Sequence, residues 1–167
     1  MPTLFHSRSA LTAILFVVLW LSASTNGYAQ HGGPFARLAG SWSGGGTIDL
    51  SDGRRERLRC RAAYDVPSQR NLGLSIRCAS ESYNFDLRSS VALTASTVTG
   101  TWSESATGVS GDVSGRASGD HISVLAISPS FSATMSLTTH GSSQSVVIRS
   151  RDPNSTIRGV SISLRRG

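Results

Sequence analysis

The sequence contains no lysine, only two cysteines and few aromatic residues, which make up 7% of the chain. After residue 30 it also lacks any stretch with the apolar period of an amphipathic helix, which excludes an α-helical or α/β domain. No apolar run reaches the roughly 20 residues that a membrane-spanning helix needs, so we expect no membrane span in the mature form. Two cysteines exclude a disulfide-rich scaffold and leave one intramolecular pairing.

Histidines and acids are too scattered for the common catalytic and metal sites. The histidines after residue 30 are His31, His121 and His140, and none lies at the short spacing of a zinc pair. Asp120 precedes His121, but neighbouring strand residues point to opposite faces and would not form an acid–base pair. The G-x-S-x-G motif is absent. We therefore expect no catalytic residue, no metal site and no cofactor.

The first residues have the order of a secretory signal peptide. A short polar region with Arg8 precedes the apolar run 10–21, and small residues end at Ala29. This order predicts a signal helix that is cleaved after Ala29, and a periplasmic or secreted protein. No cysteine lies near that site, which excludes a lipoprotein anchor. The predicted organisation is a signal peptide over 1–29, a lead-in over 30–39 and a single domain over 40–167.

From residue 40 onward, short segments alternate apolar and polar residues and are separated by Gly, Ser and Asp turns. This pattern predicts about 8–10 short strands and an all-β domain, an antiparallel up-and-down β-barrel. Ser51-Asp52-Gly53 fits a three-residue hairpin loop that closes on a glycine bulge.

Two further loops set strand registers. A four-residue loop over 105–108 would place Trp102 opposite Gly111, and Val113 opposite Gly100. A two-residue His140-Gly141 loop would pair Leu137 with Gln144, and Met135 with Val146.

The segment 54–80 holds both cysteines on two alternating stretches, which we interpret as a stapled β-hairpin. A turn over 67–70 would place Cys60 opposite Cys78, and the same register pairs Ala62 with Ile76 and Tyr64 with Leu74. Export to an oxidising compartment makes a Cys60–Cys78 disulfide the expected pairing.

The polar face of this hairpin carries a cluster of arginines, which contribute to a formal net charge of +6. Two interpretations stay open: a solvated face balanced by acids on the next strand, or a patch that binds an anionic partner. The chain has no basic tail and no aromatic residues among the arginines, so we expect no nucleic-acid binding. The candidate patch consists of Arg55, Arg57, Arg59, Arg61 and Arg77.

The aromatic residues of the apolar face are the second candidate site. They either fill the core, as in most small barrels, or line a ligand cavity in which glycines leave room. The candidate lining residues are Trp42, Tyr64, Tyr83, Phe85, Trp102 and Phe131.

The tripeptide Gly40-Ser41-Trp42 at the start of the first strand resembles the G-x-W feature of the calycins, the lipocalin and avidin group of barrels. This resemblance implies an up-and-down barrel with a ligand cavity, but no particular ligand. In a closed barrel Arg166 would lie near Trp42 and form a cation-π contact. The chain also resembles small exported proteins of rhizobial-type bacteria through segments such as LRCRAAY and TGTWSE, which implies export without an activity.

The sequence thus predicts an exported, monomeric, non-catalytic binding module that holds a small apolar ligand in its barrel. An envelope interaction protein or inhibitor, acting through loops or the arginine-rich outer face, is the alternative. An enzyme of unknown class is the third hypothesis.

Overall fold

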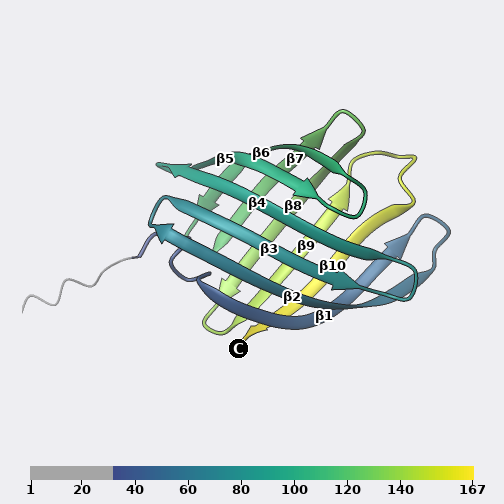
Figure 1. The fold of residues 1–167 in the computed structure, drawn as a ribbon, viewed down its shortest axis with the longest axis horizontal. Coiled ribbons are helices and arrows are strands. Elements are labelled where there is room, and N and C mark those ends of the chain that lie inside the picture. Colours follow the sequence, from purple (N-terminus) through teal and green to yellow (C-terminus); the bar gives the residue numbers. More distant parts are fainter. Residues whose placement is uncertain (1–31) are drawn as a thin grey trace, which may run out of the picture. The chain divides into compact units, whose positions relative to one another are not determined.

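The computed structural model describes residues 32–167, which form a closed antiparallel β-barrel. Each strand pairs with the next one along the chain, and the last pairs with the first (Figure 1). The predicted all-β, up-and-down barrel is therefore confirmed. The ten strands are β1 (Gly40–Leu50), β2 (Arg55–Ser68), β3 (Asn71–Ala79), β4 (Asn84–Thr94), β5 (Thr97–Glu104), β6 (Val109–Ser118), β7 (His121–Ser128), β8 (Phe131–His140), β9 (Ser143–Ser150) and β10 (Ile157–Arg166).

The predicted signal peptide over 1–29 lies outside the described residues. Within 32–167 there is no helix of the length and apolarity needed to cross a membrane.

Two of the predicted hairpin loops have a glycine where the backbone adopts a positive φ. Gly53 has a φ of 83° and its N–H donates to the carbonyl of Leu50, which closes the predicted three-residue loop between β1 and β2. The four residues 105–108 join β5 and β6, and Gly108 has a φ of 70°. L side chains rarely adopt such positive φ values, so glycine is favoured at both positions.

The β5–β6 register is the predicted one, with Trp102 opposite Gly111 and Val113 opposite Gly100. The structure gives a stronger reason for the glycines than room for a neighbouring ring. A Cβ atom at Gly111 would lie 1.9 Å from the carbonyl oxygen of Ile127. These inward-facing glycines therefore let neighbouring strands approach closely.

The predicted position of the loop between β8 and β9 is wrong by one residue, which changes the strand pairing by two residues. The two-residue loop is Gly141-Ser142, because His140 still pairs with Ser143 as the last residue of β8. Leu137 consequently lies opposite Val146 instead of Gln144, and Met135 lies opposite Ile148 instead of Val146. Gly141 has a φ of 56°, so this register places glycine at the loop position that needs a positive φ. Because the shift is two residues, every side chain keeps its predicted face.

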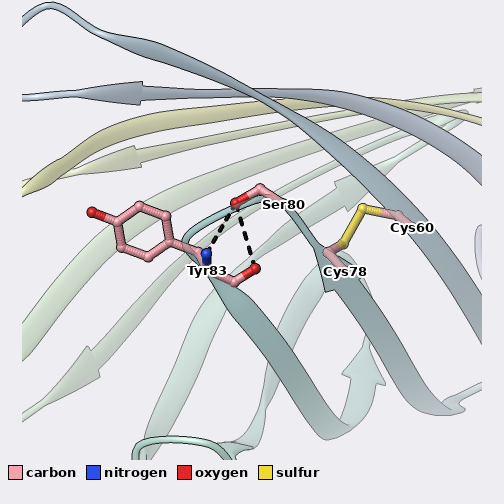
Figure 2. The surroundings of a disulfide bond; sticks show 4 residues. All are labelled: Cys60, Cys78, Ser80 and Tyr83. Carbon is pink, nitrogen blue, oxygen red and sulfur yellow. Dashed lines mark hydrogen bonds between the residues drawn. A yellow bond between two sulfur atoms is a disulfide. The ribbon is translucent and has the colours of Figure 1, made fainter.

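The stapled hairpin is confirmed. Cys60 and Cys78 are bonded across β2 and β3, and the neighbouring pairs Ala62–Ile76 and Tyr64–Leu74 have the predicted register. Figure 2 shows the disulfide between the two strands, close to the turn in which the Tyr83 N–H donates to Ser80 Oγ at 3.0 Å. Such a bond is typical of an oxidising, extracytoplasmic environment.

Candidate functional site

The interior of the barrel differs between its two ends. One end, which we call the closed end, is filled by the segment 34–39 that precedes β1. Phe35 and Leu38 of this segment are 0% and 1% exposed, so both side chains belong to the core. Two tight turns hold the segment, with Ala36 N donating to Gly33 O and Leu38 N donating to Phe35 O. The sequence predicted only a lead-in over 30–39, although this segment contains two apolar residues three positions apart.

Trp42 organises the closed end. Its indole N–H donates to the carbonyl of Leu38 at 2.7 Å, and its ring meets Tyr64 edge-on with centroids 6.4 Å apart. The Arg166 guanidinium lies over the same ring and also donates to the carbonyl of Ala39 at 2.8 Å and to that of Arg37. One aromatic side chain therefore joins the N-terminal segment, β2 and the end of β10.

A buried polar chain crosses the interior next to this cluster. The Tyr64 hydroxyl donates to Gln144 Oε1 at 2.7 Å, and Gln144 Nε2 donates to Thr139 Oγ1 at 3.2 Å. All three residues are buried. Burial raises the pKa of the Tyr64 hydroxyl, although its hydrogen bond to Gln144 acts in the opposite direction. The phenol therefore stays neutral and keeps its donor role. The sequence signal for this chain was a glutamine at an inward-facing position, in line with Val146 and Ile148. The structure adds its neighbours Leu164 and Thr139.

The other half of the interior, which we call the open half, contains apolar side chains that are less completely buried. Its side chains face inward by strand parity, yet they are only partly buried against the core. They are contributed by β3, β4, β8, β9 and β10, and comprise Ile76, Leu87, Met135, Ile148 and Val160.

Small side chains on the outer face leave some backbone atoms exposed. This exposure does not explain why the inward-facing residues of the open half are only partly buried. Ile162 also faces inward, has a serine on each side along β10, and is only 4% exposed. Ile76, flanked by Ser75 and Arg77, is only partly buried. Ile76 is therefore less completely covered by its surroundings than Ile162.

Aromatic residues surround the open half near its mouth. Trp102 meets Phe131 edge-on with centroids 5.6 Å apart, and Tyr83 stacks on Phe85 with centroids 6.2 Å apart. The Trp102 side chain is 7% exposed, and its indole N–H finds no acceptor among the described residues. Of the six predicted lining residues, these four lie in the open half, whereas Trp42 and Tyr64 belong to the closed end.

Glu104 anchors one loop at the mouth. Its carboxylate accepts from the backbone N–H groups of Asp86, Ala106 and Thr107 at 2.7–3.0 Å, and from the Thr107 hydroxyl at 2.6 Å. Burial raises the pKa of Glu104, but these hydrogen bonds outweigh it and lower the pKa to about 2. Three of the four contacts lie within the loop 105–108 and the fourth is to the backbone of Asp86 on β4, so the role of this acid is structural.

The predicted arginine patch lies on the outer face of β2 and β3. Arg55 pairs with Asp49 at 2.6 Å and Arg77 pairs with Asp86 at 3.0 Å. Acids on neighbouring strands therefore balance the charges of these two arginines. The remaining three, Arg57, Arg59 and Arg61, are exposed and have no ion pair within residues 32–167.

Two histidines lie near the loops of the closed end. His140 Nε2 contacts Asp120 Oδ2 at 2.6 Å, and His121 Nδ1 contacts Thr138 Oγ1 at 3.0 Å. The acid therefore meets His140 from another hairpin, while its sequence neighbour His121 turns away. In the described part of the chain, no three His, Cys, Asp or Glu residues gather as metal ligands would.

Comparisons with known proteins give the fold alone. No family model and no curated protein matches the sequence. The barrel is similar to Rv2717c from M. tuberculosis, with a TM-score of 0.64 and 14% identity over 79% of this chain and 94% of that one. It is also similar to the S-type phycobiliprotein lyase CPES from Guillardia theta, with a TM-score of 0.55 and 10% identity over 80% and 90% of the two chains. Both likenesses extend over nearly all of the other protein, so the barrel is a complete fold in each case.

Proposed function

We propose that this protein is an exported, non-catalytic binding module that holds a small apolar ligand in the open half of its barrel. The observation that carries the proposal is the partial exposure of inward-facing side chains such as Ile76, Leu87 and Met135. Apolar surface that water reaches inside a closed sheet gains about 25 cal/mol for each Å² that a ligand covers. We therefore propose an apolar ligand, because the side chains of the open half are apolar.

The division of the barrel into two halves supports this proposal. The closed end contains the buried polar chain and the Trp42 cluster, which fix the shape of the sheet independently of a ligand. The open half contains partly exposed aliphatic and aromatic side chains. A rigid scaffold beside an accessible apolar surface is the usual arrangement of a small-molecule site. The disulfide supports the export part of the proposal.

A titration of the mature protein with N-phenyl-1-naphthylamine, a neutral fluorescent apolar probe, tests the proposal. We expect saturable binding that Met135→Trp weakens at least about tenfold, because the larger ring fills the open half. Thr134→Trp is the matched control, since Thr134 is exposed on the outer face of the same strand. Thermal unfolding of both variants checks the fold.

Absence of saturable binding by the wild-type protein would overturn the proposal. Equal weakening by the inward and the outward tryptophan would do the same, because it would place the probe on the outer surface.

A further inference from the structure

The outer face of the barrel carries a second candidate site, which is separate from the interior and lies around the arginines of β2. Arg57, Arg59 and Arg61 alternate along β2, so their side chains leave the sheet on one side at intervals of about 7 Å. We call these three residues the arginine row. Asp49 of β1 lies opposite Arg55, and Asp65 lies further along β2. Between Arg55 and Asp65 the outward-facing positions of β2 carry no acid, because Glu56 lies on the opposite face of the strand, opposite Ile48.

The surface next to the arginine row is low and rich in hydroxyl groups. The residues of β1 that lie directly opposite the three arginines are Thr47, Gly45 and Ser43. The next strand, β10, presents Ser161 and Ser163 at its outer face. We call these five residues the hydroxyl strip.

At its end nearest Arg61, the strip passes into a depression in the outer surface. The exposed or partly exposed residues around this depression are Ser41, Ser43, Arg61, Ala63, Ser75, Arg77 and Gly167. Trp42 and Ala62 also border it, but both are buried and face the core. Arg61 and Arg77 lie directly opposite each other on β2 and β3. Like charges in this arrangement are destabilising, and Asp86 offsets only the charge of Arg77. An anion in the depression would relieve the remaining repulsion.

We propose that the arginine row and the hydroxyl strip together bind a linear anionic polysaccharide. Guanidinium groups bind carboxylate or sulfate groups through paired hydrogen bonds, and serine and threonine hydroxyls exchange hydrogen bonds with sugar hydroxyls. A regular row of cations beside a row of small hydroxyl residues matches a chain that carries both kinds of group along its length.

The other common polyanions fit this face less well. Single-stranded nucleic acids need aromatic platforms on which bases stack, and the row and strip contain no aromatic residue. An anionic membrane surface is held by apolar side chains that insert beside the basic ones, and the same residues offer none. The polysaccharide is therefore the occupant that the chemistry favours. This inference does not depend on a ligand in the barrel.

The test measures binding of the intact mature protein to polygalacturonate, with dextran as the uncharged chain. The variant with Arg57→Gln, Arg59→Gln and Arg61→Gln removes the arginine row. A matched triple, Arg88→Gln, Arg116→Gln and Arg149→Gln, removes the same charge from three exposed positions on β4, β6 and β9.

We expect the row variant to raise the Kd for polygalacturonate at least about tenfold and to flatten its salt dependence, while the matched triple changes the Kd less than about threefold. Equal losses in the two triples would overturn the proposal, because net charge alone would explain the binding. It would also be overturned if dextran bound equally well, or if single-stranded DNA or phosphatidylglycerol vesicles bound more tightly than polygalacturonate.

Discussion

The guanidinium of Arg166 lies 4.7 Å from the centroid of the Trp42 ring, so the end of the last strand is fixed to the start of the first. The same guanidinium donates to two carbonyls of the segment that fills the closed end. The Arg166 side chain therefore contributes both to closing the sheet into a barrel and to holding the segment that fills one end of that barrel.

Arg166→Ala should lower the free energy of unfolding by about 1–2 kcal/mol, because it removes the cation-π contact together with both hydrogen bonds. Arg165→Ala is the control, since that side chain makes only a 3.4 Å contact to Ser143 at the surface. Urea denaturation of both variants gives the comparison. Equal stabilities for the two variants would mean that the Trp42 contact contributes nothing to closure.

Loss of the disulfide should cost about 3 kcal/mol, because the bond closes a loop with a sequence separation of 18 in the unfolded chain. The Cys60→Ala, Cys78→Ala double variant and the wild-type protein in dithiothreitol should unfold at the same lowered urea concentration. An unchanged midpoint in both samples would contradict this prediction.

Glu104 makes stability depend on pH in the acid range. Its folded pKa of about 2 lies below the unfolded value of 4.5, so the carboxylate stabilises the fold above pH 4.5. That contribution is lost as the pH falls from 4.5 toward 2. Glu104→Gln should therefore destabilise the protein by about 1–3 kcal/mol at pH 7, with a smaller difference at pH 2.5.

Urea denaturation at the two pH values checks this expectation, with Asp112→Asn as the control for an exposed acid. A difference between wild type and Glu104→Gln that stays constant over this pH range would show that the carboxylate charge is not responsible.

Gly46→Ala should destabilise the barrel by about 1–3 kcal/mol, because the added Cβ would lie 1.8 Å from the carbonyl oxygen of Ser161. Gly73→Ala is the matched control, since its Cβ would meet nothing nearer than 3.7 Å. Thermal unfolding distinguishes the two. A Gly46→Ala variant as stable as Gly73→Ala would mean that β1 and β10 can separate at Gly46 without loss of stability.

Strand parity explains how much of the fold the sequence could reveal. Alternation assigns each residue to a face, and a fixed contact such as Cys60–Cys78 then sets the register of the flanking pairs. Parity cannot distinguish registers that differ by two residues, which is why Leu137 was predicted to pair with Gln144 instead of Val146. The position of Gly141 in the loop decided that case.

The candidate site was less predictable, because a list of inward-facing residues does not show which of them meet. Trp42 and Trp102 both face inward, but only Trp42 lies beneath the N-terminal segment that fills one end. The filling depends on Phe35 and Leu38, which precede the first strand and follow no strand period. The outer arginines were assigned to the correct face, yet only the structure distinguishes the two that have acids from the three that have none.

The pairing of β1 with β10 also determines what an incomplete chain would present to its surroundings. A chain that stops before Ile157 lacks β10, so β1 keeps only β2 and β9 keeps only β8 as a neighbour, and each then offers a free row of N–H and C=O groups on its other side. Such edges recruit strands from other molecules, so truncation at the C-terminus should produce aggregates rather than a smaller soluble barrel. The final ten-residue strand thus protects every copy of this protein from its neighbours.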